Sequence, residues 1–302
     1  MPKLQLDKNL EILDKNQEFF LVLGTSHSIG ECLIEEIDQR WLDEEERYLH
    51  ILSEKLGIPY LLLGFGGSEN WELTQMLLSF FRNNPHAKHT CKFVLGEVRL
   101  GSYLPVLPTD TFSYNGPMEN WRYDKKTPTW KTSSGISKNN RRLFSHITSN
   151  SMNVTSEEYA IHLSNNFWGG KEDYYPALKS FLDVYVLTHG TSWAYQSCFY
   201  EIVTMYEYCR VIGIPYCWFT MSYWKNTSNE FWYNYILDSL KEEYKDVYES
   251  NLFKDENDLM NCMGFKYFND ADTKCNCGHL DERYQPKMAE FIFEKLNTIL
   301  HK

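Results

Sequence analysis

QEFFLVLGTSHSIG, residues 17–30, is the stretch from which the fold prediction starts. Its first half, 17–23, is a short apolar run that ends at Gly24, which is typical of a strand in the middle of a sheet. Its second half is a turn rich in Gly, Ser and Thr. Apolar and acidic residues then recur three and four apart, which predicts a helix from Glu31 to about Leu56.

A second and a third strand follow this first unit. Gly57-Ile58-Pro59 precedes an apolar run, and the sequence predicts strands over 60–65 and 91–98 with an amphipathic helix over 70–82 between them. Strands that alternate with helices at this spacing favour a parallel sheet with crossover helices.

The alternation stops after Leu100. Residues 101–165 are rich in Pro, Ser, Thr and Asn, and an unstructured loop of that length is unusual inside a compact domain, so we expect an inserted, lid-like or accessory segment. Further on, helices are predicted over 174–187, 193–212 and 284–300, a strand over 216–221, and a mostly helical segment over 228–262. The predicted fold class is a three-layer α/β/α, flavodoxin-like arrangement around a mostly parallel sheet, in a single domain over 1–302.

Charge and hydropathy exclude several classes of partner. Acidic residues outnumber basic ones 41 to 30, for a net charge of -11, which disfavours binding to a phosphate backbone. No apolar run approaches the roughly 20 residues of a membrane span, and the N-terminus lacks a secretory signal. We therefore expect a cytoplasmic protein that binds neither nucleic acid nor membrane, with an oligomeric state that the sequence leaves open.

The turn after the first predicted strand carries two hydroxyl groups, Ser26 and Ser28. Ligands of α/β proteins bind at the carboxyl end of the strands, where this turn lies, although either serine could instead cap the predicted helix. At the other end of the chain, His279 lies just before the terminal helix. A histidine there can reach over the sheet edge, so we interpret Ser26 and His279 as a pair.

Four short blocks give the chain a resemblance to the SGNH (GDSL-type) hydrolase family. The blocks, in family order, are Gly24-Thr25-Ser26-His27-Ser28-Ile29-Gly30, Gly66-Gly67-Ser68-Glu69-Asn70, Gly96-Glu97-Val98, and His279 ten residues before Ala289. Thr25 stands where the family has Asp. The variant spelling is similar to forms from tailed phages and environmental bacteria, which extends the expected location to the cytoplasm of a virus-infected cell.

The resemblance implies an ester hydrolase, either an esterase or a carbohydrate O-deacetylase. Ser26 would be the nucleophile and His279 its base, with the amides of Ser26 and Gly67 as oxyanion donors. Val98 occupies the position of the family's oxyanion Asn, and the next residue, Arg99, is the candidate replacement; Arg99 could equally hold a carboxylate such as Glu97.

The acid of the triad also departs from the family pattern. Asn276 stands where the family has Asp, three residues before His279, and an amide cannot offset the charge of an imidazolium. Asp272 lies close enough upstream to orient His279 instead. The candidate catalytic set is therefore Ser26, His279, Asn276 and Asp272.

Aromatic residues suggest the substrate. Trp121 and Trp168 could form a cleft wall that suits a sugar face, or else the small core of the insertion. Gly96 and Asn70 are the other candidate substrate-binding residues, and we expect a small-molecule or glycan ester as substrate. No cofactor is expected.

Two alternatives remain. The departures at Val98 and Asn276 also fit a catalytically inactive glycan-binding or structural protein of the same fold. A zinc site could be drawn from Cys262, Cys275, Cys277 and His279, but Cys-x-Cys is not the usual spacing of zinc ligands. We therefore predict reduced, structural cysteines and no metal.

Overall fold

A computed structural model describes about half of the chain. The described residues are 12–13, 16–25, 28, 31–33, 39–41, 44–64, 70–99, 104–106, 121–124, 129–132, 145–147, 196–220, 227–254 and 284–300. For the short strands within 31–41 and 104–147, and for 227–233, only the backbone is described. The chain divides into two compact units, one made of 1–100 and 199–302 and the other of 101–198, and each is treated by itself.

The first unit is built on a four-stranded parallel sheet. Its strands, in spatial order, are β10 (Tyr216–Thr220), β5 (Cys91–Val98), β1 (Phe19–Gly24) and β4 (Tyr60–Gly64). All six residues of β1 are buried, as expected for a strand with a neighbour on each side and a helical layer on each face. The predicted parallel sheet is confirmed.

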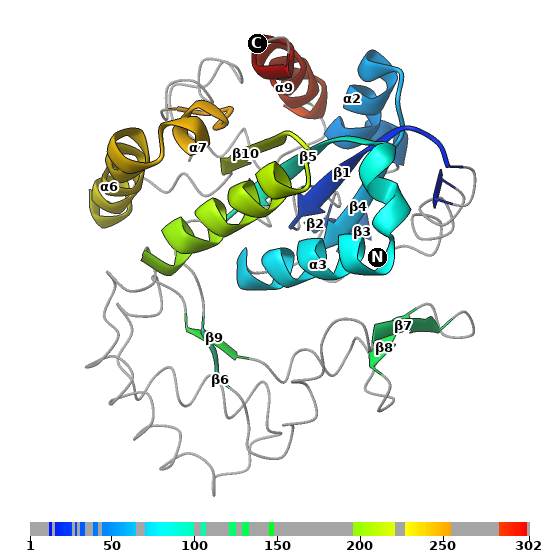
Figure 1. The fold of residues 1–302 in the computed structure, drawn as a ribbon, viewed down its shortest axis with the longest axis horizontal. Helices are drawn as coiled ribbons and strands as arrows, with labels where there is room; N and C mark the ends of the chain where they lie inside the picture. The colour runs from blue at the N-terminus through cyan, green and yellow to red at the C-terminus, as the bar shows by residue number, and fades with distance from the viewer. Residues whose placement is uncertain are drawn as a thin grey trace, which may run out of the picture. The chain divides into compact units, whose positions relative to one another are not determined.

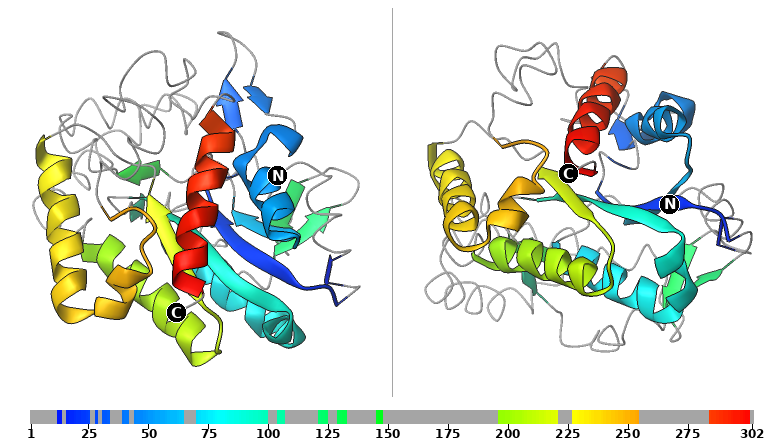
Figure 2. Two further views of the ribbon diagram at one scale, coloured as in Figure 1. Left: turned by 90° about the horizontal axis from the view of Figure 1, so that it is seen from above. Right: turned by 45° about the horizontal axis from the view of Figure 1, so that its top comes forward.

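Helices cover both faces of the sheet (Figures 1 and 2). The helices of this unit are α2 (Tyr48–Leu56), α3 (Asn70–Asn83), α6 (Thr227–Glu243), α7 (Lys245–Glu249), α9 (Gln285–Leu300) and an unlabelled helix over 196–211. Of these, α6 lies to the side of the sheet, beyond β10 (Figure 1). Two short 3-10 helices are η1 (Glu44–Glu46) and η2 (Pro85–His89). With α2 and α9 on one face and α3 with 196–211 on the other, the unit is the three-layer α/β/α arrangement that the sequence predicts (Figure 2).

A run of aromatic rings joins the sheet to the α2 and α9 layer. Tyr48 of α2 meets Phe219 of β10 edge to face at 6.3 Å, Phe219 meets Phe253 at 5.6 Å, and Phe253 stacks on Phe291 of α9 at 4.7 Å. Each such pair stabilises the fold by about 1 kcal/mol beyond the free energy gained by burying its apolar surface. These contacts therefore fix both α2 and α9 to β10.

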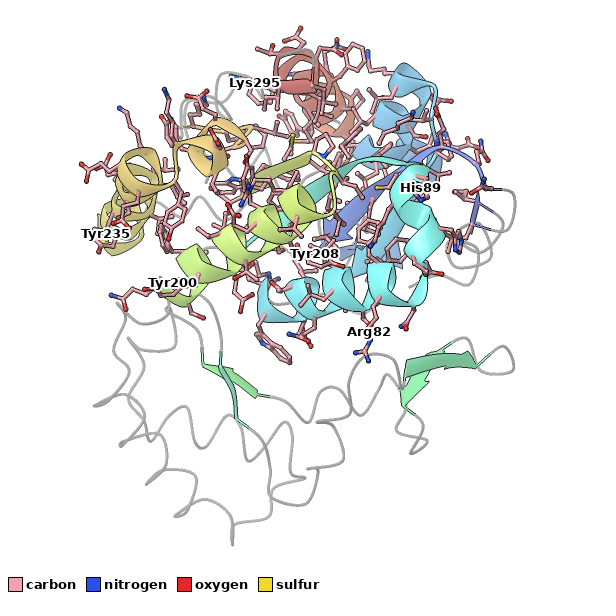
Figure 3. The ribbon with its side chains drawn as sticks, viewed as in Figure 1. Arg82, His89, Tyr200, Tyr208, Tyr235 and Lys295 are labelled. Carbon is pink, nitrogen blue, oxygen red and sulfur yellow. The ribbon has the colours of Figure 1, made fainter. Side chains whose placement is uncertain are left out.

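The opposite layer is held in the same way. Phe19 of β1 contacts Phe80 of α3 edge to face at 6.3 Å, and Phe81 of α3 contacts Tyr208 of the 196–211 helix at 6.4 Å. Figure 3 labels Tyr208 and Tyr200 on that helix. Tyr208 contacts α3, whereas Tyr200 is 63% exposed.

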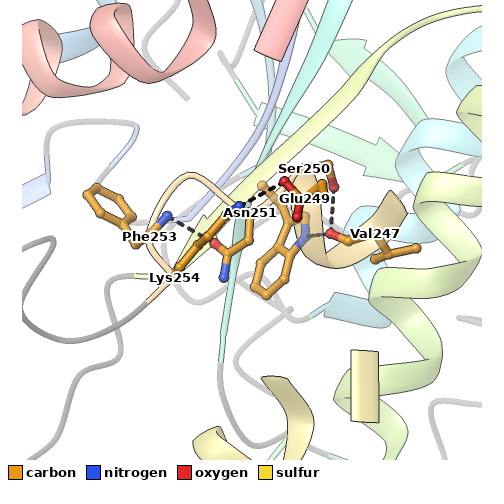
Figure 4. A network of polar contacts seen from close by, with 7 residues as sticks. Val247, Glu249, Ser250, Asn251, Phe253 and Lys254 are labelled. Carbon is orange, nitrogen blue, oxygen red and sulfur yellow. Dashed lines mark hydrogen bonds and ion pairs between the residues drawn. The ribbon is translucent and has the colours of Figure 1, made fainter. Parts of the chain in front are cut away.

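Beyond β10 the chain adds a short extended piece to the edge of the sheet. Asn251 pairs with Trp218 in parallel: the Trp218 amide donates to the Ser250 carbonyl at 3.1 Å and the Leu252 amide to the Trp218 carbonyl at 2.8 Å. The Trp218 indole N–H donates to the Val247 carbonyl at 3.0 Å (Figure 4). Because this pairing is parallel, the chain after Asn251 runs toward the carboxyl edge of the sheet.

The helix predicted from Glu31 to Leu56 is wrong in its first half. Residues Glu31–Leu33 form strand β2, which pairs antiparallel with β3 (Gln39–Trp41), and α2 begins only at Tyr48. The five residues between β2 and β3 suit a hairpin connection, and a short apolar pattern does not separate a helix from a strand. The turn after β1 therefore does not lead directly into a helix.

The second unit contains two antiparallel strand pairs among its described residues. These are β6 (Leu104–Val106) with β9 (Ser145–Ile147), and β7 (Trp121–Asp124) with β8 (Thr129–Thr132). The unit begins at Gly101, where the sequence pattern breaks. The predicted end of the insertion at residue 165 and the predicted helix over 174–187 lie outside the described residues. Within the described part of the chain, no helix is long and apolar enough to cross a membrane.

Candidate functional site

The four parallel strands end at one edge of the sheet. Their last residues are Gly24, Gly64, Val98 and Thr220. Ligands of open α/β sheets bind outside this edge, because the loops that leave the strands converge there. The turn that contains Ser26 and the residues after β5 both start at this edge.

The carboxylate of Glu97, the second-last residue of β5, binds residues of the turn that follows β1. Its Oε2 accepts hydrogen bonds from the main-chain amides of Thr25 at 2.9 Å and Ser28 at 3.1 Å. The hydroxyl of Thr25 donates to Oε1, and the hydroxyl of Ser28 donates to Oε2. Glu97 is 2% exposed, so both carboxylate oxygens are satisfied by the turn rather than by solvent.

Ser28 connects this turn to α2. Its hydroxyl has one proton, which it donates to Glu97, so the Tyr48 hydroxyl donates to the Ser28 oxygen, at 2.6 Å. Burial, reinforced by the negative charge of Glu97, raises the pKa of Tyr48 well above its ordinary value. Tyr48 is therefore a neutral hydrogen-bond donor at physiological pH.

Two glycines bring β1 and β4 together at this edge. Gly64 has φ of +135°, and a Cβ there would lie 1.9 Å from the Gly24 carbonyl oxygen. A Cβ on Gly24 would lie 2.4 Å from the Cβ of Ser28. The Ser28 side chain thus lies directly against the end of β1, where only glycine leaves space for it.

The residues after β5 are held by Asn70, the first residue of α3. Its Nδ2 donates to the Arg99 carbonyl at 2.7 Å, and its Oδ1 accepts from the Arg99 amide at 2.9 Å. Asn70 is fully buried. The main-chain N–H of Arg99 is therefore engaged by Asn70, and an oxyanion donor from Arg99 would have to be its guanidinium group.

Gly96 lies against Tyr216 of β10. A Cβ at residue 96 would be 2.4 Å from the Tyr216 hydroxyl oxygen and 3.0 Å from ring carbon Cζ. The structure thus gives Gly96 a packing role between two strands, and its role in substrate binding stays a prediction.

The segment expected to carry the base leaves and re-enters the described chain close to this site. It leaves after Lys254, on the piece that runs parallel to β10. It re-enters at the start of α9, where Oε1 of Gln285 accepts from the main-chain amide of Tyr48 at 2.9 Å. Gln285 thus binds the residue whose hydroxyl holds Ser28.

All four predicted catalytic residues, and two other predicted site residues, lie outside the described residues. These are Ser26, Gly67, Trp168, Asp272, Asn276 and His279, together with Cys262, Cys275 and Cys277 of the alternative zinc site. Trp121 lies in β7, with only its backbone described. Of the remaining predicted residues, Asn70 and Arg99 are bonded to each other, and Gly96 lies one residue before Glu97.

Comparisons with known proteins find matches among solved structures only. No family model and no curated protein match the chain. Among solved structures, the chain is similar to one titled "Crystal Structure of TesA", with 11% sequence identity over 93% of this chain and 99% of that chain, and a TM-score of 0.45. The resemblance to phage forms stays a prediction.

The sequence analysis gives Glu97 a role only as a possible partner of Arg99 and does not name Tyr48, so it missed the bonds that both residues make to the serine turn. Glu97 is the one charged residue in the buried stretch FVLGEV, residues 93–98, and a buried charge needs several partners. The hydroxyl-rich turn after β1 was the matching donor set. The buried carboxylate and the hydroxyl-rich turn, taken together at the same edge of the sheet, are the signal that pairs them.

No metal site is formed by the described residues. Among them, no group of three or more His, Cys, Asp or Glu side chains is placed to hold an ion. Cys91, Cys198, Cys209 and Cys217 are buried and in no disulfide, as expected of cysteines that pack as small apolar side chains. The reduced state of the cysteines stays a prediction.

Proposed function

We propose that this protein is a serine-dependent ester hydrolase in which Ser26 is the nucleophile and His279 the base. The observation that carries the proposal is the clamp of Glu97 on Thr25 and Ser28, the neighbours on either side of Ser26 and His27. A nucleophile gains most from being held in one orientation, because misplacement by about 1 Å can cost a hundredfold in rate. The four hydrogen bonds to Glu97 are a means of holding the residues next to Ser26 in one orientation.

The contact between Gln285 and Tyr48 supports the assignment of His279. His279 lies six residues before Gln285, and six residues span at most about 20 Å. Gln285 binds Tyr48, whose hydroxyl binds Ser28, two residues from Ser26. A histidine six residues before Gln285 is close enough in sequence to extend to the serine turn, and this supports its assignment as the base.

The proposed reaction has two steps. His279 takes the proton of the Ser26 hydroxyl as its oxygen bonds to the ester carbonyl carbon, and the imidazolium returns that proton to the leaving alcohol as the ester C–O bond breaks. Water then attacks the acyl-enzyme with the same histidine as base, which releases a carboxylic acid and restores Ser26. The main-chain amides of Ser26 and Gly67, with the guanidinium of Arg99, would stabilise the oxyanion.

Within this proposal the substrate is an ester of a small molecule or glycan, with a carbohydrate O-acetyl group as the specific candidate. The support is the set of aromatic residues Trp121 and Trp168, whose flat rings suit sugar faces. Asn276 or Asp272 would orient His279.

The proposal is tested with a fluorophosphonate probe and with p-nitrophenyl acetate. We expect the folded protein to form a phosphonyl adduct on Ser26, located by peptide mapping, and Ser26→Ala to abolish both the adduct and the hydrolysis. Ser79→Ala, at a serine of α3 that accepts a 3.4 Å hydrogen bond from Asn83, is the matched control and should retain both. An unlabelled Ser26 in folded protein would refute the nucleophile and favour the inactive, glycan-binding alternative.

A further inference from the structure

We infer that Glu97 is a positioning residue for Ser26: it holds the turn after β1 in the single conformation that presents the nucleophile. This role rests on the proposed function and gives a role to Glu97, a residue of the third family-like block to which the resemblance assigns none. Glu97 acts through the turn, so it is not a catalytic residue.

The two carboxylate oxygens divide the turn between them. Oε1 accepts the Thr25 hydroxyl, and Oε2 accepts both main-chain amides and the Ser28 hydroxyl. The bonded residues lie on both sides of Ser26 in sequence, so Glu97 fixes the main chain before and after the nucleophile. Hydrogen bonds to an ionised acceptor are about twice as strong as neutral ones, which makes a carboxylate effective here.

The surroundings confine Thr25 and Ser28. Thr25 is 1% and Ser28 0% exposed, and Gly24 offers no space between its own backbone and Ser28. If Glu97 were lost, two buried amides and two hydroxyls would lack their acceptor. Each such group costs about 1–3 kcal/mol, so the turn would rearrange to find other partners.

Tyr48 extends this restraint to α2 and α9. Its hydroxyl holds Ser28, and its main-chain amide is held by Gln285. Removal of this hydroxyl leaves all four hydrogen bonds to Glu97 in place. Tyr48→Phe is therefore a graded variant that loosens the turn without removing the carboxylate.

The test compares Glu97→Gln with wild type in three measurements. These are kcat and KM for p-nitrophenyl acetate, the rate at which the fluorophosphonate labels Ser26, and hydrogen exchange of the Thr25 and Ser28 amides. A carboxamide keeps one acceptor oxygen, so folding is retained more readily than in Glu97→Ala. We expect kcat and the labelling rate to fall together, about 10- to 100-fold, with KM changed less than about twofold and with faster exchange at both amides.

Glu201→Gln is the matched control. Glu201 is half-buried, whereas Glu97 is fully buried, but it too accepts a threonine hydroxyl, that of Thr74 at 2.5 Å. It lies on the 196–211 helix. We expect this variant to keep the wild-type kcat and labelling rate. A drop equal to that of Glu97→Gln would show a general effect of losing a buried carboxylate and would overturn the inference.

The outcomes separate the inference from the proposed function. If Ser26→Ala is inactive while Glu97→Gln keeps the wild-type kcat, Ser26 is the nucleophile and the positioning role is wrong. If wild-type protein neither labels at Ser26 nor hydrolyses the ester, the proposed reaction is wrong and the role falls with it. Should Glu97→Gln fail to fold, Thr25→Val and Tyr48→Phe decide: each removes one hydroxyl from the network, and a wild-type kcat in both would overturn the inference.

Discussion

The side-chain amide of Asn70 binds the main chain of Arg99 at two points, as donor to its carbonyl at 2.7 Å and as acceptor from its amide at 2.9 Å. The pair joins the first residue of α3 to the residue that follows β5. Because α3 is the element that follows β4, this contact connects the chain after β4 to the chain after β5 at the carboxyl edge of the sheet.

We expect Asn70→Ala to destabilise the protein by about 2 kcal/mol. The substitution leaves a partly buried donor and a partly buried acceptor of Arg99 without their partner. Asn83→Ala, at the exposed end of the same helix, should cost less than about 0.5 kcal/mol. Urea unfolding of wild type and the two variants measures the difference. Equal midpoints for the three proteins would show that the Asn70–Arg99 contact does not contribute to stability.

Gly64→Ala should be among the most destabilising substitutions in the sheet, at about 3 kcal/mol. The new Cβ would overlap the Gly24 carbonyl oxygen at 1.9 Å, in a backbone conformation with φ of +135°. Gly57→Ala is the control: it also has a positive φ, +67°, but open space around it, so about 1 kcal/mol is expected from backbone strain alone. Thermal unfolding of both variants tests this order, which a smaller loss for Gly64→Ala would reverse.

The sequence predicts the sheet well because each strand is a local signal. The third strand, predicted over 91–98, is observed as β5 with those bounds, and the helix predicted over 70–82 is observed as α3 over Asn70–Asn83. The stretch from Glu31 was predicted as a helix and is wrong because its apolar spacing also fits the β2–β3 pair, whose stability depends on pairing across the connection.

The site is harder to predict because its contacts are distant in sequence. The bonds from Thr25 and Ser28 to Glu97 span about 70 residues, and that from Tyr48 to Gln285 spans 237. Local pattern finds the turn and its hydroxyls, but the order of strands in the sheet decides that β5, and so Glu97, lies beside β1. Strand order is a tertiary property, which periodicity does not contain.

Gly96→Ala should destabilise by about 2 kcal/mol, and Tyr216→Phe should relieve part of that loss. The Cβ would meet the Tyr216 hydroxyl at 2.4 Å, which phenylalanine removes, and Cζ at 3.0 Å, which it retains. A double-mutant cycle on unfolding free energies is expected to give a coupling of about 1 kcal/mol. Additive effects would show that the two side chains do not compete for this space.

Three buried cysteines should resist alkylation in the native protein. Burial raises the pKa of Cys91 and of Cys217 to about 12, and the pKa of Cys209 is also raised by burial. Since the thiolate is the reactive form, iodoacetamide at pH 8 should label these positions only after denaturation. Peptide mapping by mass spectrometry separates them from the other cysteines, and native labelling at Cys209 within minutes would contradict the burial.

Glu201 should make the stability of the protein depend on pH in the range between its pKa in the unfolded chain and its pKa in the folded protein. Burial raises its pKa, and the hydrogen bond from Thr74 opposes that rise. A carboxyl whose pKa is raised on folding contributes stability that is complete below its unfolded pKa, about 4.3, and that is lost as pH rises through the folded pKa.

Glu201→Gln removes this titration, so the stability of the variant relative to wild type should increase as the pH rises from about 4 to 7. The amide oxygen of glutamine still accepts the Thr74 hydroxyl, so packing is preserved. Thr74→Val removes the hydrogen bond that lowers the pKa of Glu201. The stability of this variant should therefore change more with pH than that of wild type. Urea unfolding at a series of pH values measures all three proteins. A constant difference between wild type and Glu201→Gln across this range would show that burial of this carboxyl has no effect on its titration.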